Sequence, residues 1–347
     1  MNDDAYARAG VDVSAADRGV RAIVDVLRAI DTGRPSRSVL SSGHYASVLE
    51  IAPGLGIAIS TDGVGSKLIL AEQTGMLDGV GIDCVAMNVN DVVCVGAEPI
   101  AMLDYIAVER ADPEVLARIA RSLARGAELA GVEIPGGELA VLPELIRGHP
   151  SPGGFELSGT AFGTVALDRL VTGEHCAPGD VLIGMPSSGL HSNGYTLARK
   201  IADGHLSERP PALGGASVAQ ALLEPTTIYV RAVLALLRGS AAVHGLAHIT
   251  GDGLRNLTRL NRGVGFAIDD PLPVPAICEW LCEQGELDGA QAHEVFNMGL
   301  GFVAIVDAPD APDAAALLAE HHPGARVIGH VNADPGAVAL PALGLRL

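Results

Sequence analysis

The chain is poor in aromatic residues, in cations and in long apolar runs, and each shortage argues against a class of protein. Only 3% of its 347 residues are aromatic, so a core that draws on 48% hydrophobic residues must consist mainly of Ala, Val, Leu and Ile. The 23 Lys and Arg residues face 41 Asp and Glu residues, which gives a net charge of −18. This charge argues against nucleic acid and anionic membranes as partners, since both require a basic surface. No apolar run reaches the ~18 residues that span a bilayer.

Cysteine is also scarce, and its spacing does not indicate a metal finger or a redox pair. The five cysteines form no CxxC motif, although Cys278 and Cys282 lie one helical turn apart. We interpret these two as core residues of an amphipathic helix in preference to a metal pair. The polar and acidic start, "MNDDAYARAG", differs from a signal peptide. These features predict a reduced, cytoplasmic protein.

The length and the order of the patterns predict two domains of mixed α+β structure. A length of 347 residues exceeds one ordinary core, and the polar stretch 168–180 predicts a boundary between domains 1–170 and 171–347. Helical and strand patterns alternate without the even βαβ repeat of a doubly wound sheet. We predict helices at 14–30, 81–96, 112–131, about 194–203, about 225–238, 273–284 and 311–321, and strands at 56–60, 99–108, 154–167, 181–185, 264–268 and 302–306.

Several common catalytic motifs are absent. The chain has no GxxxxGK[ST], no HExxH and no GxSxG. The stretch "GLGFVA" at 299–304 fits GxGxxA, but it leads into a strand pattern instead of following one into a helix. A nucleotide must therefore be held by a less common device.

The stretch "STDGVGSK" at 60–67 is the first candidate site. It follows a buried strand pattern, and its glycines allow main-chain amides to approach a ligand closely. Here Asp62 could hold Mg²⁺ and Lys67 could contact a phosphate oxygen. An Asp turn with a solvated Lys explains the stretch equally well when it is considered alone.

The stretch "MNVNDVV" at 87–93 is the second candidate. On a helix, Asn88 and Asp91 lie three residues apart and share a face. Burying such residues beside Val, Cys and Met is costly without partners, and Mg²⁺ prefers oxygen ligands. The alternative is the solvated face of an amphipathic helix, but the apolar neighbours favour a site.

A third carboxylate comes from "IPGGELA" at 134–140, where Pro135, Gly136 and Gly137 predict a tight loop that ends at Glu138. An ordinary turn with an exposed Glu is an equally good explanation of this stretch alone. Three carboxylates from separate segments of one half-chain nevertheless strengthen the hypothesis of a metal site.

A Gly/Ser loop in the second half predicts an anion site. In "PSSGLHSNGYTLARK" at 186–200 a strand pattern ends, a loop follows and a helix begins, so main-chain N–H groups and the helix dipole both favour phosphate. Within this loop His191 could donate to the phosphate. The stretch "HITGDGLRNL" at 248–257 is either a second such loop or a plain strand–turn–helix connection.

Together these motifs resemble phosphoribosylformylglycinamidine cyclo-ligase (AIR synthetase), a family of the PurM-like ATP-binding superfamily. The matching segments occur in family order over nearly the whole chain: "YARAGVD", "TDGVGSK", "GIDCVAMNVNDVVCVGAEPIAMLDYIA", "PGGE", "GDVLIGMPSSGLHSNGYTLARK", "HITGDG" and "FNMGLGF". The resemblance implies ATP-dependent closure of formylglycinamidine ribonucleotide to aminoimidazole ribonucleotide through an iminophosphate, with release of ADP and phosphate. It also implies a homodimer whose N-terminal domains build a shared β-barrel, each with a C-terminal α/β domain.

The resemblance also assigns roles to individual residues. It implies ATP and Mg²⁺ as cofactors, a phosphorylated ribonucleotide as substrate, and catalytic roles for Lys67, Asp91 and His191. The implied metal ligands are Asp62, Asp91 and Glu138. The implied nucleotide site comprises Gly43, His44, Thr61, Asp62, Gly63, Gly65, Lys67, Asn88, Asn90, Gly136 and Gly137. The implied phosphate loop comprises Ser187, Ser188, Gly189, His191, Ser192, Asn193 and Gly194.

The chain departs from the family pattern at three places, and we interpret it as a divergent branch. The glycine-rich segment that covers nucleotide in the family is here "SSGHYASVL", with bulky His44 and Tyr45. Val141 stands where many members have a second Glu, and Asp252 where a glycine is usual. The alternatives are another ATP-using relative, such as one similar to thiamine-monophosphate kinase, and a non-catalytic paralogue that binds purine intermediates.

Overall fold

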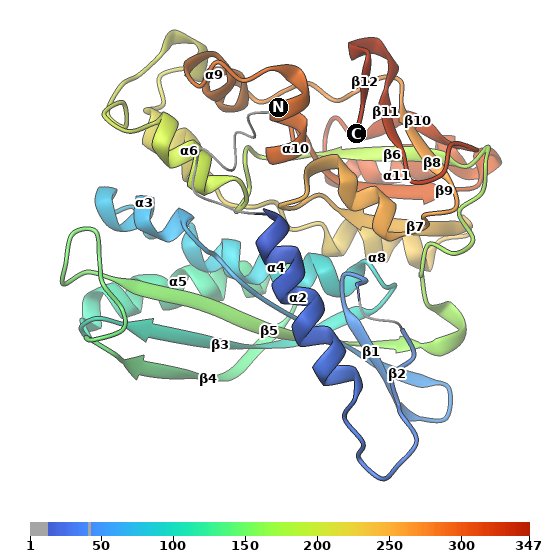
Figure 1. Ribbon diagram of the computed structural model, residues 1–347, viewed down its shortest axis with the longest axis horizontal. Helices are drawn as coiled ribbons and strands as arrows, with labels where there is room; N and C mark the ends of the chain where they lie inside the picture. The colour runs from blue at the N-terminus through green and yellow to red at the C-terminus, as the bar shows by residue number, and fades with distance from the viewer. Residues whose placement is uncertain (1–12, 41–42) are drawn as a thin grey trace.

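Two β-sheets, one from each half of the chain, organise the structure, which is a computed structural model that describes residues 13–40 and 43–347 (Figure 1). The first sheet has the order β1-β2-β5-β3-β4 and the second the order β12-β11-β8-β10-β6-β9-β7. The strands of the first are β1 (Ser47–Ala52), β2 (Leu55–Gly63), β3 (Glu98–Val108), β4 (Glu133–Val141) and β5 (Phe155–Ala166). Those of the second are β6 (Val181–Pro186), β7 (Val243–His248), β8 (Gly265–Ile268), β9 (Leu300–Val306), β10 (Arg326–Asn332), β11 (Val338–Leu340) and β12 (Leu345–Arg346).

Among the described elements, helices cover the first sheet on one face only. Its central strand β5 alternates between buried and half-buried residues, as expected for a strand with one packed face. The packed face lies against α4 (Val80–Val93) and α5 (Pro113–Ala130). In Figure 1, α4 and α8 (Val230–Arg238) lie between the two sheets, so α4 belongs to the layer that joins the two halves.

Helix α5 shows how the sequence sets an element's ends. The Asp112 carboxylate accepts hydrogen bonds from the N–H groups of Glu114 and Val115, Pro113 occupies the first helical position, and Gly131 ends the helix in a left-handed conformation with φ +76°. Close packing against α4 needs a glycine, because a Cβ on Gly81 would lie 2.2 Å from the main-chain nitrogen of Leu123.

The second sheet is buried more completely. Every residue of β9 is buried, which requires cover on both faces and explains its continuous apolar sequence "LGFVAIV". Helices α8 and α11 (Ala311–His321) pack together, and α11 also contacts β6 and β10. The other helices are α3 (Lys67–Thr74), α6 (Tyr195–Ile201), α7 (Val218–Leu222), α9 (Ala276–Gln284) and α10 (Gly289–Val295), and the 3₁₀ segment η3 (Gly253–Arg259) follows β7.

Helix α2 (Val13–Arg28) lies apart from both cores. Its apolar residues Val20, Ile23, Val26 and Leu27 are all more than half exposed. A hollow of about 880 Å³ separates α2 and the segment after it from Leu49 on β1. Among the described residues, each helix is too short or too polar to span a bilayer.

The predicted mixed α+β class is confirmed, but the predicted loop at 134–137 is wrong. Residues 133–141 form β4, an edge strand that pairs in parallel with β3. Proline is tolerated at an edge, where its missing N–H breaks no ladder on the solvent side. The predicted helix at 225–238 begins only at Val230, because Thr226, Thr227 and Tyr229 bond to α4 instead.

Candidate functional site

Acidic and amide side chains from the first half meet a histidine of the second half between the two sheets. At the end of β2, the Asp62 carbonyl accepts a hydrogen bond from Asn88 Nδ2 on α4 at 3.2 Å. One turn along α4, the Asp91 carboxylate accepts from Nδ1 of His248, the last residue of β7, at 2.9 Å. The predicted residues Asp62, Asn88 and Asp91 are thus neighbours, and His248 joins them.

This group has oxygen atoms in excess of donors. Burial raises the pKa of the Asp62 carboxyl, and the nearby Asp91 charge raises it further. The buried Asn88 Oδ1 has no hydrogen-bond partner in the described part of the chain. Two carboxylates and an amide oxygen are the ligand types that Mg²⁺ prefers, and a cation here would relieve both the repulsion and the unpaired acceptor. The residues therefore fit a bound Mg²⁺.

Glu138, the third predicted metal ligand, lies elsewhere within one chain. Strand pairing aligns Asp62, Gly159, Asp104 and Gly137 in one row across the sheet. Glu138 is the next residue of β4, so its side chain points to the opposite face from Asp62. Two strands also separate β2 from β4, and Glu138 is exposed. One chain alone does not bring these three carboxylates together.

Lys67 is fully buried, and its ammonium group has no N–H left for a phosphate in this structure. Nζ bonds to Asp83 Oδ1 at 2.9 Å, to the His191 carbonyl at 2.9 Å and to the Glu224 carbonyl at 2.8 Å, which uses all three donors. Burial lowers the pKa of Lys67, and the Asp83 charge opposes that shift. The geometry makes Lys67 a link between α3 and two loops of the second half.

Asp83 extends this link. Its Oδ1 also accepts from the N–H and the hydroxyl of Thr226, both at 2.7 Å, and the Thr226 hydroxyl contacts the Ser192 hydroxyl at 3.1 Å. Sequence reasoning missed Asp83, because an acid four residues into a helix usually signals a solvated first turn. The buried pair instead fixes the loop that contains His191 and Ser192.

The loop 187–194 has the opposite character to the carboxylate group. The Ser187 hydroxyl donates to Asn297 Oδ1 and the Ser188 hydroxyl to the Pro225 carbonyl, so these side chains are occupied within the protein. By contrast, the main-chain N–H groups from Gly189 to Gly194 donate to no acceptor within 13–40 and 43–347. Several of these residues are buried or half-buried, and successive unpaired N–H groups form a typical anion-binding concavity.

His191 lies at the centre of this loop in a strained conformation. Its φ is +62°, which is unusual for a residue other than glycine, and the side chain is fully buried. Burial holds the pKa of His191 well below its usual value, and the nearby His248 and Lys67 lower it further. Because Nε2 accepts from the Ser188 N–H at 3.4 Å, the ring proton lies on Nδ1. That Nδ1 is buried without a partner in the described chain.

Gly194 and Asn193 complete the loop. Gly194 has φ +76°, and a Cβ there would lie 2.7 Å from the Phe296 ring, so only glycine fits. A Cβ on Gly251 would lie 3.4 Å from Asn193 Oδ1, which places the "HITGDG" loop directly beside this one. Helix α6 has only seven residues, so the main-chain N–H groups, more than the helix dipole, give the loop its anion-binding character.

The remaining predicted nucleotide residues are spread over several places. Asn90 is buried and uses its amide to hold Thr227 and Tyr229 at 2.9 Å each. The Thr61 hydroxyl donates to the Gly159 carbonyl on the sheet. Gly43 and His44 precede β1, and His44 Nε2 donates to the Thr172 carbonyl at 3.2 Å. The glycines Gly63, Gly65, Gly136 and Gly137 lie at or near strand ends or on the edge strand.

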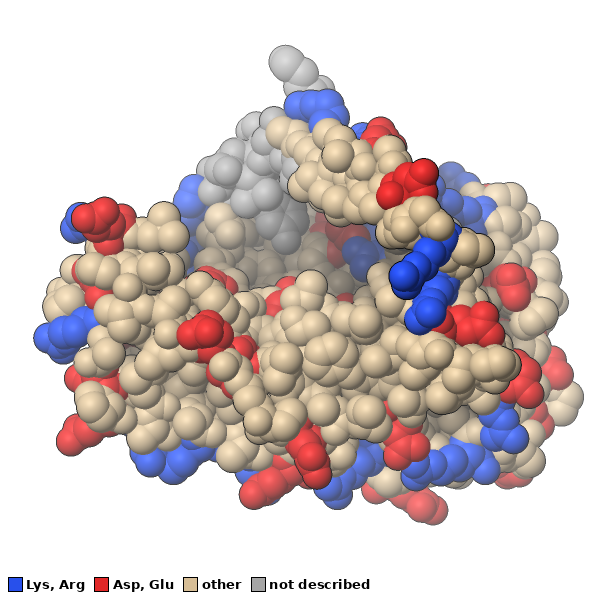
Figure 2. Space-filling view, turned by 90° about the horizontal axis from the view of Figure 1, so that it is seen from below, with Lys and Arg blue, Asp and Glu red and all other residues tan. Residues whose placement is uncertain are grey.

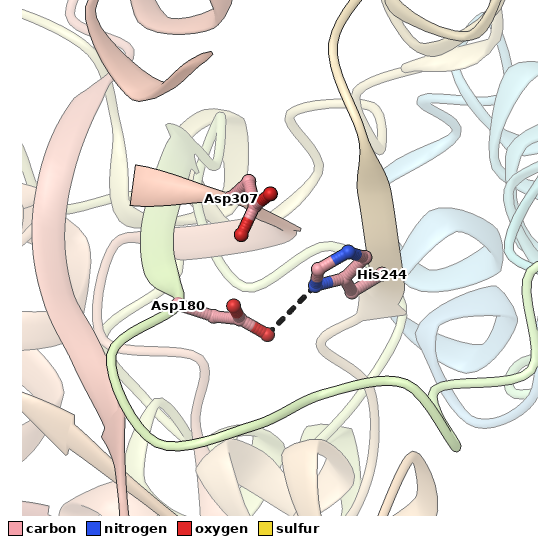
Figure 3. A group of neighbouring side chains, drawn as sticks. All are labelled: Asp180, His244 and Asp307. Carbon is pink, nitrogen blue, oxygen red and sulfur yellow. Dashed lines mark hydrogen bonds and ion pairs between the residues drawn. The ribbon is translucent and has the colours of Figure 1, made fainter. Parts of the chain in front are cut away.

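One further group of side chains could hold a metal ion, and it lies at the far end of β6 from the Ser187 loop (Figure 3). His244 Nδ1 lies 2.8 Å from Asp180 Oδ2, with Asp307 beside them. Asp180 Oδ2 also accepts from the Ala177 N–H at 2.9 Å. Within the described ranges no other three His, Cys, Asp or Glu side chains lie close enough together to share one ion. This group joins strand ends and is separate from the Asp62 site.

A carboxylate and amide group beside a loop of unpaired N–H groups is an arrangement that suits an enzyme acting on phosphorylated ligands. Comparison with known proteins agrees. Residues 43–165 match the AIR synthase related protein N-terminal domain, and residues 177–340 match its C-terminal domain. The chain therefore belongs to the AIR synthase related family.

Curated relatives refine this assignment. A phosphoribosylformylglycinamidine cyclo-ligase of Methanothermobacter thermautotrophicus is 42% identical over 97% of both chains. One of Thermococcus gammatolerans is 44% identical over 95% of this chain and 96% of the relative. The family resemblance predicted from the motifs is confirmed.

Solved structures show the same fold at low identity. The hydrogenase maturation protein HypE in complex with ATP has a TM-score of 0.62 at 21% identity, over 90% of this chain and 89% of that chain. ThiL complexed with AMPPCP and TMP has a TM-score of 0.63 at 15% identity, over 87% and 89%.

The signal that sequence reasoning underused was "HITGDG". The motif predicts a possible ligand loop but does not by itself assign a role to its histidine. The structure places His248 on Asp91 and near His191, with ring centroids 6.4 Å apart. A histidine at the end of a buried strand, followed by glycines, is typical of a side chain aimed at a ligand.

Proposed function

We propose that this chain catalyses the ATP-dependent closure of formylglycinamidine ribonucleotide to aminoimidazole ribonucleotide, with ADP and phosphate as the other products. The observation that carries the proposal is the junction between the two sheets, where Asp62, Asn88 and Asp91 of the first half lie beside loop 187–194 of the second. Its first-half side presents oxygen atoms suited to Mg²⁺ on a nucleotide, and its second-half side presents unpaired N–H groups suited to a ribonucleotide phosphate. The sequence identity of 42% and 44% to two cyclo-ligases, over nearly the full length, supports this choice of reaction.

The reaction proceeds by two substitutions whose atoms balance. The formyl amide oxygen attacks the γ-phosphorus of ATP, the bond to the bridging oxygen breaks, and ADP leaves with that electron pair while the amide nitrogen loses a proton. The amidine nitrogen then attacks the formyl carbon. Phosphate departs with the former formyl oxygen, and loss of one proton completes the imidazole ring.

The chain's own residues position these steps. Mg²⁺ held by Asp62, Asn88 and Asp91 would neutralise charge on the β- and γ-phosphates. Nδ1 of His191, a neutral donor at a ligand-facing loop, suits an oxygen of the substrate. Next to it, His248 Nδ1 lies 2.9 Å from the Asp91 carboxylate, and His248 Nε2 lies 3.5 Å from Asn90 Nδ2.

We also propose a homodimer that closes the open face of the first sheet. That face presents six apolar or aromatic side chains among Thr and Ser residues: Leu55, Ile57, Ile59, Leu103, Tyr105 and Phe162. Figure 2 views the molecule from this side and shows a broad central area without charged residues. Because Glu138 shares this face with Tyr105, a second copy would place Glu138 at the interface. Light scattering combined with size exclusion distinguishes one copy from two.

The direct test is incubation with ATP, Mg²⁺ and formylglycinamidine ribonucleotide while ADP and aminoimidazole ribonucleotide are measured. Equimolar formation of both products supports the proposal. Formation of ADP with a different acceptor, such as thiamine monophosphate, would assign a kinase reaction instead. Binding of the ribonucleotide without turnover would assign a non-catalytic role. The cytoplasmic location predicted from the sequence stays a prediction.

A further inference from the structure

Asn297 is a buried residue between α10 and β9, and its side chain holds the start of the loop 187–194. Strand β9 pairs with β6 in antiparallel fashion, so the segment before β9 lies beside the loop that follows β6. Nδ2 of Asn297 donates to the Gly189 carbonyl at 2.8 Å, and Oδ1 accepts from the Ser187 hydroxyl at 3.0 Å. One side chain therefore holds two residues of the loop.

The orientation of the Asn297 carboxamide follows from its partners. Its Oδ1 also accepts from the Gly299 N–H at 3.0 Å, and a main-chain N–H can only donate. The Gly189 carbonyl can only accept, so it must face the NH₂ group. Gly299 has φ +97°, and a Cβ there would lie 2.3 Å from the Pro273 carbonyl oxygen, so this contact needs a glycine. The stretch "FNMGLGF" at 296–302 thus supplies a group that both donates and accepts, which neither a carboxylate nor an apolar side chain does.

The bond from Asn297 to Gly189 fixes the direction of a main-chain donor. The peptide unit between Gly189 and Leu190 is trans, and in a trans unit the C=O and N–H bonds point in opposite directions. Because the Gly189 carbonyl points at Asn297, the Leu190 N–H points away from it. This N–H donates to no acceptor in the part of the chain that the structure describes, although Leu190 is buried.

Lys67 holds a second peptide unit of the loop in the same way. Its Nζ donates to the His191 carbonyl at 2.9 Å, so the Ser192 N–H points away from Lys67. Lys67 is charged, however, and pairs with Asp83 of the first half. Asn297 is neutral, and its contacts lie within the second half alone. A substitution of Asn297 therefore changes the loop without leaving a buried charge unpaired.

We propose that Asn297 is a positioning residue for the substrate phosphate: it holds the Gly189 carbonyl away from the ligand, so that the Leu190 N–H faces the phosphate. This inference rests on the proposed function and adds a residue to it. Asn297 transfers no proton, and no bond of the substrate forms or breaks at it. Its neutral carboxamide also keeps negative charge away from a loop whose main-chain N–H groups bind an anion.

Affinity for one ligand at a time tests the proposal without turnover. Calorimetry measures the binding of ribose 5-phosphate, which has the phosphate group of a ribonucleotide, and of Mg²⁺–AMPPCP, a non-hydrolysable ATP analogue. At about pH 8, Asn297→Asp should weaken binding of ribose 5-phosphate roughly tenfold or more, because its carboxylate repels the Gly189 carbonyl and the phosphate. The affinity for Mg²⁺–AMPPCP should stay within about twofold.

Asn261→Asp is the matched control for this substitution. Asn261 makes the same two kinds of bond between other segments: Nδ2 donates to the Cys176 carbonyl at 3.2 Å, and Oδ1 accepts from the Gly263 N–H at 2.8 Å. Its replacement introduces the same charge, so neither affinity should change if the effect belongs to Asn297.

The pH dependence separates positioning from a general loss of structure. Burial beside a carbonyl should raise the pKa of the introduced carboxyl, so that at about pH 5 it is neutral and can again donate from one oxygen and accept at the other. The Kd of Asn297→Asp for ribose 5-phosphate, divided by the wild-type Kd at the same pH, should then fall toward one. Asn297→Leu should keep a raised ratio at both pH values. Comparison at equal pH removes the titration of the phosphate itself.

Several results would overturn the proposal. They are an unchanged affinity of Asn297→Asp for ribose 5-phosphate at about pH 8, equal weakening for both ligands, a Kd ratio that does not fall with pH, and a wild type that does not bind ribose 5-phosphate. If Asn297→Asp does not fold, Asn297→Leu tests the same selectivity between the two ligands. If the wild type makes no imidazole product but the selective effect is present, the substrate assignment fails and the role of Asn297 stands.

Discussion

The two sides of the junction differ in which hydrogen-bonding groups lack partners. The first-half side, with Asp62, Asn88 and Asp91, has more oxygen acceptors than donors, and its carboxylates repel each other. The second-half side, from Gly189 to Gly194, has main-chain donors without acceptors among the residues that the structure describes. The difference shows how a chain of net charge −18 can bind two phosphorylated ligands: a cation mediates on one side, and neutral main-chain dipoles act on the other.

Removing the charge of Asp91 should impair the first-half side alone. It should lower activity more than any other substitution below. Asp91→Asn should lower kcat for product formation by roughly a thousandfold, because both the Mg²⁺ ligand and the partner of His248 change. Steady-state assays measure kcat, and circular dichroism checks the fold. The exposed Asp313→Asn on α11 serves as a control of equal charge change. Unchanged turnover in Asp91→Asn would disprove the metal assignment.

Removing the Lys67–Asp83 ion pair, which links the two halves, should mainly lower the free energy of unfolding. Lys67→Met leaves the Asp83 carboxylate buried without its cation, so unfolding in urea should show a loss of about 3–5 kcal/mol. The double variant Lys67→Met, Asp83→Asn removes the unpaired charge and should recover much of that loss. A stable Lys67→Met whose only defect is ATP binding would restore the sequence-based view of Lys67 as a phosphate ligand.

Adding a side chain at Gly194, the end of the phosphate loop, should weaken binding on the second-half side alone. Gly194→Ala places a methyl group against Phe296 in a left-handed conformation, so the KM for the ribonucleotide should rise about tenfold while the KM for ATP changes little. Gly204→Ala is the matched control, since Gly204 has φ +80° with open space around its Cα. Equal shifts in both KM values would mean that the two sides are not separate sites.

Neutralising Asp62 should have the smallest effect on the unliganded protein, and it should be stabilising. The pKa of Asp62 is raised in the folded state by burial and by Asp91. Around and above its usual pKa the unfolded chain therefore binds fewer protons than the folded one, and stability falls as pH rises through the raised value. Asp62→Asn should raise Tm by about 1–3 °C at neutral pH and show no gain at low pH. A lower Tm at neutral pH would contradict the repulsion argument.

The sequence predicted elements well where one periodic pattern dominates. Helix α5 has a capping Asp112, Pro113 and a terminal Gly131, and it forms as expected. Strand β4 was missed because Pro135, Gly136 and Gly137 have the composition of a turn, while an edge position beside β3 accepts them. A local sequence pattern does not show whether a sheet edge is available to pair with the segment.

A site residue could be predicted where its neighbours in the sequence are also its neighbours in space. Asn88 and Asp91 were found because a polar pair stands within an apolar helix, and the structure buries or half-buries both. Lys67 was interpreted as a phosphate ligand because its partners, Asp83 and the carbonyls of His191 and Glu224, lie 16 to 157 residues away.

Binding measured one ligand at a time tests the two-sided account most directly. Calorimetry with Mg²⁺–AMPPCP and with formylglycinamidine ribonucleotide should be done on wild type, Asp91→Asn and Gly194→Ala. Asp91→Asn should lose affinity for the nucleotide and keep it for the ribonucleotide, and Gly194→Ala should do the reverse. Loss of both affinities in either stably folded variant would contradict the two-sided account.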